Sequence, residues 1–142
     1  MTSRWKQRYT NFIQALAQLE LYVAKGTLTE LEEPGFIKTF EFVCEMAWNT
    51  IKDFYVGQGS DAISETLRIQ GRRDAVRLAF QRGLIRDAKA WLRLIEDRNR
   101  TSHAYYEGLV KRVGKNIRRE YIILFRELAE ILKPAFEKED EP

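Results

Sequence analysis

The chain has 142 residues, of which 44% are apolar and 32% are charged, and its formal net charge is +3. This balance is typical of a single soluble globular domain rather than of a disordered chain. The sequence has no apolar run long enough to cross a membrane and no secretory signal in residues 1–6, so we expect a cytoplasmic protein. One cysteine, Cys44, excludes an internal disulfide, and with one histidine, His103, we expect no metal site and no cofactor.

Charge is segregated along the chain. Residues 20–65 include nine acidic and three basic residues, whereas residues 68–100 include ten basic and four acidic residues. One interpretation is a basic face for a polyanion and an acidic face for a partner protein. The other is that these are solvated helix faces that neutralise each other in the fold. The first interpretation predicts that a partner docks on Glu30, Glu32, Glu33, Glu41 and Glu45.

Apolar residues recur at spacings of three and four along most of the chain, which indicates amphipathic helices. The pattern predicts helices over about 5–23, 35–56, 74–82, 88–102 and 108–135. Gly26 and Gly83 are expected to end the first and third of these helices, and Asp87 to cap the start of the fourth. The stretch from 57 to 71 is consistent with either a loop or one short turn of helix.

Four long helices and one short helix, joined by mostly short connections, predict an all-α, up-and-down helical bundle. The second helix has two adjacent apolar rows and is expected to be the central core helix. We expect a single domain over residues 1–136, followed by an acidic disordered tail over residues 137–142.

The segment from Arg98 to Tyr105 combines three side chains of distinct chemistry. His103 lies five residues after Arg98 and two before Tyr105, where the helical pattern breaks at residues 106–108. Histidine exchanges protons near neutral pH, arginine is the preferred donor to phosphate, and the tyrosine hydroxyl can be modified. A lone histidine is more often structural or merely exposed, so the surroundings of this motif decide its meaning.

The spacing within the motif has a geometric consequence. A straight α-helix turns by about 100° per residue, so Arg98 and His103 would lie about 140° apart around it. Asn99 and His103, four residues apart, would share a face. A pairing of Arg98 with His103 therefore needs either unwinding near Ser102 or a second protomer related by a twofold axis.

Three stretches carry a family resemblance: residues 40–48, 75–85 and 91–105, the last of which holds the Arg-x4-His-x-Tyr motif. They resemble the HEPN-type "nucleotidyltransferase substrate-binding" group. This group is the helical half of the paired minimal nucleotidyltransferase/HEPN systems of bacteria and archaea, which act as toxin–antitoxin pairs. The resemblance covers nearly the whole chain apart from the termini.

The resemblance implies a helical protomer that is usually a homodimer and works with a cognate minimal nucleotidyltransferase. The wide apolar face of the second helix and the many aromatic residues also predict a homodimer or higher even oligomer. It also implies a metal-independent ribonuclease site formed by Arg98 and His103, with Asp97 and Asn99 in support. Tyr105 would be the modification acceptor, and a nucleotide placed there by the partner would silence the site. The expected substrate is RNA or a nucleotide, and no membrane is involved.

A non-enzymatic alternative stays open, in which the chain is the substrate-binding subunit of a two-component nucleotidyltransferase. Arg98 would then hold a nucleotide phosphate, and His103 would be a hydrogen-bonding residue. The chain has no Gly-Ser followed by paired acidic ligands, so we do not expect it to be a nucleotidyltransferase itself. A plain nucleic-acid-binding bundle is a third interpretation and rests only on the basic stretch after residue 68.

Overall fold

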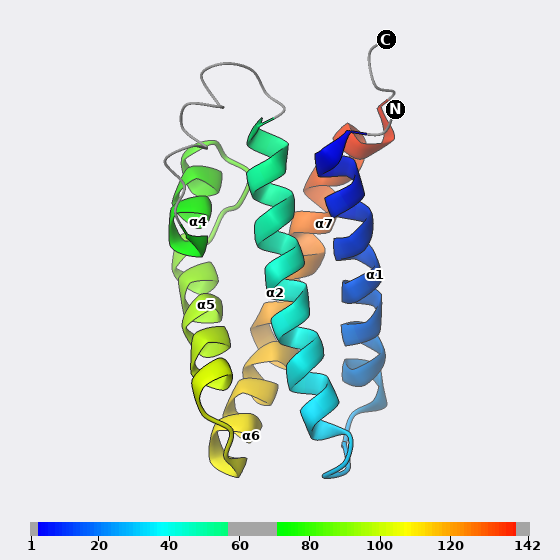
Figure 1. The fold of residues 1–142 in the computed structure, drawn as a ribbon, viewed down its shortest axis with the longest axis vertical. Coiled ribbons are helices and arrows are strands. Elements are labelled where there is room, and N and C mark those ends of the chain that lie inside the picture. Colours follow the sequence, from blue (N-terminus) through cyan, green and yellow to red (C-terminus); the bar gives the residue numbers. More distant parts are fainter. Residues whose placement is uncertain (1–2, 57–70, 139–142) are drawn as a thin grey trace.

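The computed structural model describes residues 3–56 and 71–138, and these fold into helices without a strand. The elements are α1 (Arg4–Lys25), α2 (Glu33–Val56), α4 (Arg72–Gln81), α5 (Ala88–His103), α6 (Glu107–Asn116), the π-helical turn η1 (Ile117–Tyr121) and α7 (Ile122–Glu137). They form a helical bundle, which confirms the predicted fold class (Figure 1). The predicted loop or turn over 57–71 lies, except for Gly71, outside the described residues.

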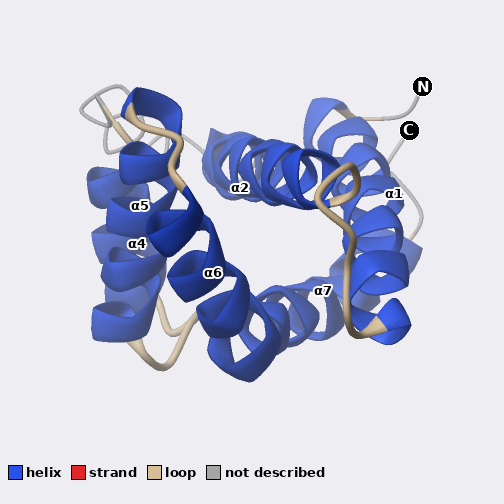
Figure 2. Ribbon diagram, turned by 90° about the horizontal axis from the view of Figure 1, so that it is seen from below, coloured by secondary structure: helices blue, strands red, loops and turns tan. Residues whose placement is uncertain are grey.

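α2 is the central helix, as predicted. It packs against α1 on one side and against α4 and α5 on the other (Figure 2). Its buried side chains follow the two predicted apolar rows and join the core cluster: Phe36, Ile37, Phe40, Val43, Cys44, Ala47, Ile51 and Tyr55. The side chains that α5 directs toward α2 are therefore held against a rigid core.

The predicted helix signals hold where they rest on local chemistry. Gly26 and Gly83 have φ angles of +82° and +78°, a left-handed conformation that glycine adopts without steric cost. The Asp87 carboxylate accepts a hydrogen bond from the backbone N–H of Ala90 at 3.0 Å, so it caps α5. The break after α5 falls at residues 104–106, slightly earlier than predicted.

The predicted last helix, 108–135, is present but is not one regular α-helix. α6, η1 and α7 follow one another without a break, and the π-helical turn lies at Ile117–Tyr121. Pro134 lies inside the last turns of α7, which continues to Glu137. The predicted tail falls largely on residues 139–142, outside the described part of the chain, so the domain boundary stays a prediction.

The start of α1 and the end of α7 lie at the same end of the bundle, and the α5–α6 connection lies at the opposite end (Figure 1). Within the described ranges, none of the helices has both the length and the apolarity needed to cross a bilayer.

Candidate functional site

Arg98 and His103 lie on the last turns of α5, and Tyr105 follows this helix. This helix is regular as far as His103, and Ala104 leaves it in an extended conformation with φ −145°. The backbone N–H of Ala104 still donates to Arg100 O at 2.9 Å. The alternative of unwinding near Ser102 is therefore wrong. Because five residues of α-helix separate Arg98 from His103, the two side chains point in different directions within one chain.

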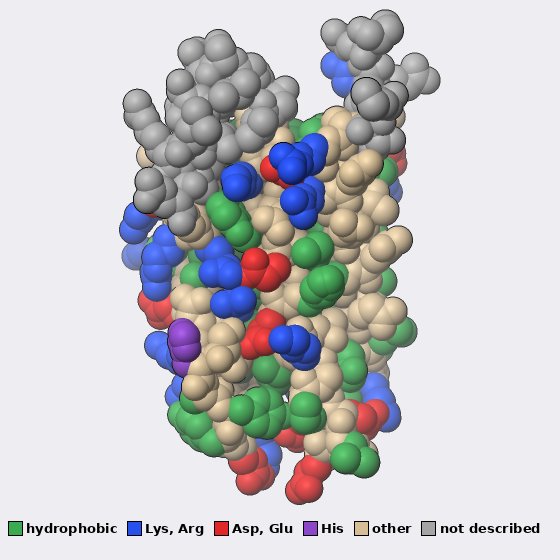
Figure 3. Space-filling model, in the orientation of Figure 1, with side chains coloured by type: hydrophobic (Ala, Val, Ile, Leu, Met, Phe, Trp, Pro, Cys, Tyr) green, Lys and Arg blue, Asp and Glu red, His purple; other side chains and the backbone are tan. Residues whose placement is uncertain are grey.

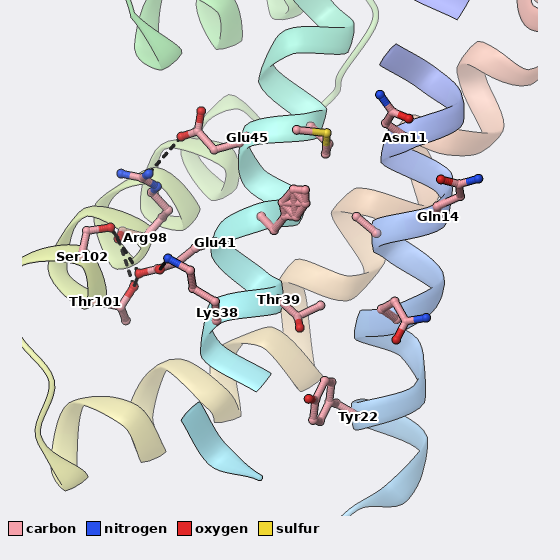
Figure 4. Close-up of a pocket in the computed structure, with 14 residues that line it drawn as sticks. Asn11, Gln14, Tyr22, Lys38, Thr39, Glu41, Glu45, Arg98, Thr101 and Ser102 are labelled. Carbon is pink, nitrogen blue, oxygen red and sulfur yellow. Dashed lines mark hydrogen bonds and ion pairs between the residues drawn. The ribbon is translucent and has the colours of Figure 1, made fainter. Parts of the chain in front are cut away.

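Arg98 points toward α2. Its Nη2 atom lies 3.0 Å from Oε1 of Glu45, and its side chain is only 20% exposed (Figure 4). Arg72, at the start of α4, contacts the same carboxylate oxygen. Arg98 thus already has an internal counter-ion, which any phosphate ligand would have to compete with or share.

Glu41, one helical turn before Glu45 on α2, contacts the polar side chains that follow Arg98 on α5. It accepts hydrogen bonds from the hydroxyls of Thr101 at 2.7 Å and Ser102 at 3.2 Å (Figure 4). Lys38 lies 3.9 Å from its other oxygen. The face of α5 that carries Arg98 is therefore joined to α2 by two carboxylates.

Three acidic residues of the predicted docking surface have partners within the chain, and docking itself stays a prediction. Glu41 and Glu45 bind cations and hydroxyls of the same chain, and Glu32 pairs with Lys25. Glu45 fits the second interpretation of the charge segregation, because it neutralises Arg72 and Arg98 of the basic half of the chain. Glu41 and Glu32 instead pair with Lys38 and Lys25 of the first half.

His103 is the last residue of α5, and Tyr105 follows it in the connection to α6. His103 is exposed and appears at the edge of the molecular surface in Figure 3. Tyr105 is 55% exposed and belongs to the three-residue segment 104–106 between α5 and α6. Asn99, one turn before His103, is half-buried. His103 and Tyr105 are thus both exposed and two residues apart, whereas Arg98 faces α2.

The ionisation of Tyr105 is set by its surroundings. Partial burial, followed by the negative charge of Glu33, raises the pKa of its hydroxyl above the ordinary value of 10.0. The hydroxyl is therefore protonated at neutral pH. Any reaction in which its oxygen acts as a nucleophile needs a base to remove the proton.

Asp97 is buried, with 3% of its surface exposed, and points into the core rather than toward the motif. Its Oδ2 atom accepts hydrogen bonds from Asn116 at 3.0 Å and from Tyr121 at 2.6 Å. Its Oδ1 atom pairs with Arg100 at 2.9 Å. The supporting role predicted for Asp97 is therefore indirect, because this carboxylate fixes α5 to the α6–α7 segment.

A groove of about 1400 Å³ crosses the face of α2 between α5 and α1 (Figure 4). Arg98, Thr101 and Ser102 line it on the α5 side. Side chains of α1 and α2 line the rest: Asn11, Gln14, Ala15, Gln18, Tyr22, Lys38, Thr39, Glu41, Phe42, Glu45 and Met46. The groove is open and combines polar and charged side chains with apolar ones, so an extended ligand or a second protein surface would fit it.

Sequence reasoning missed the residues that hold this region together. Glu45 and Arg72 lie 27 residues apart, and only the charge segregation of the two halves gave a signal for their contact. Asn116 and Tyr121 lie five residues apart, which an α-helical interpretation places on different faces.

Comparison with known proteins adds a family assignment. The family described as "Nucleotidyltransferase substrate binding protein like" matches residues 7–134, which is most of the chain. No curated protein matches the chain. The matched range includes all of α2, α4, α5 and α6, and with them the groove, Arg98, His103 and Tyr105. The chain therefore belongs to the nucleotidyltransferase substrate-binding-protein-like family.

Proposed function

We propose that this chain is the HEPN-type toxin subunit of a two-component system, silenced by a cognate minimal nucleotidyltransferase that modifies Tyr105. The observation that carries the proposal is the exposure of Tyr105. It is 55% exposed, on a three-residue connection, two residues after the exposed His103. A partner enzyme can reach this hydroxyl without unfolding either neighbouring helix.

The transfer step is a displacement at phosphorus. The Tyr105 oxygen attacks the α-phosphate of a nucleoside triphosphate, the Tyr–O–P bond forms, and the bond to the β-phosphate breaks. Pyrophosphate leaves, and the tyrosine proton passes to a base. Because the pKa of Tyr105 is raised, the step needs such a base. In this proposal the partner would supply it, together with the metal ions that hold the triphosphate.

The toxic step is metal-independent RNA cleavage. A base takes the proton of a ribose 2′-hydroxyl, the 2′-oxygen attacks the adjacent phosphorus, and the 5′-oxygen leaves with a proton from an acid. His103 acts as the base or the acid, and Arg98 neutralises the phosphate charge. Because α5 keeps Arg98 and His103 on different faces, the site takes its two groups from two protomers of a homodimer.

Modification of Tyr105 would silence this site by sterics and by charge. The transferred nucleotide brings bulk and a negative phosphate to within two residues of His103. RNA phosphate would then meet a like charge where it has to bind.

One observation favours the non-catalytic alternative, a substrate-binding subunit of a two-component nucleotidyltransferase: it agrees more directly with the family description. The pairing of Arg98 with Glu45 at 3.0 Å hinders phosphate binding by Arg98 under either function and does not separate the two. Under the non-catalytic alternative, the chain positions a substrate for the partner and cleaves nothing.

An RNA-cleavage assay on the isolated chain separates the two functions. We expect cleavage in the presence of a metal chelator, and a loss of at least about 100-fold in His103→Ala. Lys89→Ala, at an exposed position of the same helix, is the control and should cleave like the unmodified protein. If the chain cleaves no RNA, or if His103→Ala cleaves fully, the substrate-binding alternative replaces the ribonuclease.

A further inference from the structure

Three exposed cations on α6 and η1 have no acidic partner. Arg112, Lys115 and Arg119 form no ion pair or side-chain hydrogen bond with any other described residue. The exposed Arg93 of α5, by contrast, pairs with Glu120. Spacings of three and four residues place the three cations on one face of adjacent turns, which we call the basic stripe. Like charges at these spacings repel each other, so a bound anion would stabilise this face.

The acids closest to the basic stripe in the sequence are already engaged. Glu107, in the first turn of α6, pairs with Lys111 at 2.7 Å, and Glu120 is held by Arg93. The stripe therefore carries its positive charges over about 10 Å of helix, at about 1.5 Å per residue. Its side chains follow one another at intervals of about one helical turn, a spacing similar to that of neighbouring phosphates in an extended single strand.

A second groove, of about 520 Å³, lies beside the stripe, between α6 and the α1–α2 connection. We call it the α6 groove. Its basic lining residues are Lys111, Lys115, Arg118 and Arg119, and Glu33 is the one acid among its described lining residues. Because Lys111 is already paired with Glu107, three further cations face a single carboxylate. The groove thus has an excess of positive charge that favours an anionic ligand.

The acids and the free cations of the α6 groove lie toward different ends of it. The hydrogen bond with Glu107, and then the charges of Glu33 and Glu30, raise the pKa of Lys111. These acids therefore gather around Lys111. The other cations of the groove, which come later in the chain, form its basic end.

Arg118 is held in place at this basic end. Its Nη2 atom donates to the backbone carbonyl of Gly26 at 2.8 Å, and its guanidinium lies over the ring of Phe36, 4.7 Å from the ring centroid. Neither contact neutralises the charge, and the bond to Gly26 uses only one of several N–H donors. A guanidinium that is fixed before the ligand arrives binds phosphate at a lower entropic cost than a mobile one.

Two exposed tyrosines precede α6. Tyr105 and Tyr106 are 55% and 58% exposed, and Tyr106 is the residue directly before the helix. Glu33, which lines the α6 groove, acts after burial to raise the pKa of Tyr105, so this tyrosine lies near the groove. Aromatic rings next to a row of cations are typical of single-strand binding sites, because bases stack on the rings while the cations hold the phosphates. The combination favours RNA over an acidic protein surface.

We infer that the basic stripe and the basic end of the α6 groove bind the phosphate backbone of single-stranded RNA and direct it to His103. α5 ends at His103, α6 starts at Glu107, and the connection between them lies at one end of the bundle (Figure 1). RNA along the stripe would pass Tyr106 and Tyr105 before it reaches His103. The choice of RNA rests on the proposed function, whereas the excess of positive charge does not.

Binding is measured apart from cleavage in the His103→Ala background, by fluorescence anisotropy with a labelled oligouridylate. The test variant also carries three substitutions at the exposed stripe positions: Arg112→Gln, Lys115→Gln and Arg119→Gln. We expect its RNA affinity at low salt to fall at least about 10-fold. The slope of log affinity against log salt should shrink by about 2, because each phosphate contact on a single strand contributes about 0.7.

A matched control removes the same net charge from other exposed positions that form no ion pair with the described residues: Arg86→Gln, Lys89→Gln and Lys133→Gln. It should keep nearly the full affinity and salt slope. An equal loss in the two triple variants, or no RNA binding by the unmodified stripe, overturns the inference. Unchanged RNA binding by the stripe variant, with loss of its pull-down by the cognate nucleotidyltransferase, also overturns it and assigns the stripe to a protein partner.

Cleavage assays separate this inference from the proposed function. A chain that binds RNA through the stripe but cleaves none supports the inference and contradicts the ribonuclease. A chain that cleaves RNA, and whose stripe variant with intact His103 binds and cleaves equally well, supports the ribonuclease and overturns the inference.

Discussion

Tyr121 donates a hydrogen bond of 2.6 Å to the buried carboxylate of Asp97, and Asn116 donates to the same oxygen atom at 3.0 Å. In a regular α-helix, residues 116 and 121 would point about 140° apart. The π-helical turn over Ile117–Tyr121 brings them to one side, because its hydrogen bonds join residues five apart. The irregular turn is thus explained by the carboxylate that both side chains reach.

We predict that Tyr121→Phe lowers the free energy of unfolding by about 1.5–3 kcal/mol, because it removes a buried hydrogen bond to a charged group. Urea denaturation measures the change. Tyr106→Phe, at a 58% exposed tyrosine, is the control and should alter stability by less than about 0.5 kcal/mol. Equal effects of the two substitutions would show that the bond to Asp97 adds nothing.

The same tyrosine makes the free energy of unfolding depend on pH in the alkaline range. Burial, and then the hydrogen bond to Asp97, raise the pKa of Tyr121 in the folded protein above the ordinary 10.0. A group with a higher pKa when folded stabilises the fold fully below its unfolded pKa and loses this effect as pH rises beyond it. We therefore expect unfolding free energy to fall from about pH 10 upward, and less steeply in Tyr121→Phe. Parallel pH profiles for the two proteins would contradict this.

If the ribonuclease site takes Arg98 from one protomer and His103 from the other, two inactive variants should complement each other. Arg98→Ala and His103→Ala are each expected to be inactive. Mixed after partial unfolding and reassembly, they should regain about a quarter of the original rate, since half of the dimers are mixed and each has one intact site. No recovery, in a mixture shown by mass spectrometry to contain mixed dimers, rules out this arrangement.

The pairing of Arg98 with Glu45 predicts a gain of binding. Glu45→Gln removes the internal carboxylate that competes with phosphate, so RNA affinity should rise several-fold and depend more steeply on salt. Glu127→Gln makes the same change of net charge at an exposed position of α7 and serves as the control. Fluorescence anisotropy with a labelled RNA measures both variants. An equal rise in both would indicate a general charge effect.

Local signals in the sequence predicted much of the fold. The caps at Gly26, Gly83 and Asp87 depend on single residues and their neighbours, and the structure confirms each of them. The helices between these caps could be predicted from apolar periodicity, because each helix buries one face and the repeat of apolar residues marks its extent. The altered last helix was not predictable, since the π-helical turn depends on Asp97, which lies 19 residues before Asn116.

In the candidate site, too, features set by local geometry were predictable and features set by distant residues were not. That Arg98 and His103 do not share a face follows from helix geometry alone, and the regular end of α5 agrees with it. The internal partners of Glu41 and Glu45 were not predicted, because the partners of a carboxylate depend on which helices lie beside it. Arg72, which shares Glu45 with Arg98, has no local pattern that marks it.

The central claim is that a partner nucleotidyltransferase modifies Tyr105. The most direct test incubates the chain with its cognate nucleotidyltransferase, ATP and Mg²⁺, and maps the added nucleotide by tandem mass spectrometry. We expect the adduct on Tyr105, no adduct on Tyr105→Phe, and normal modification of Tyr106→Phe, whose exposed side chain is the adjacent residue. Undiminished transfer to Tyr105→Phe, or an adduct located on Tyr106 in the unmodified sequence, would contradict the claim.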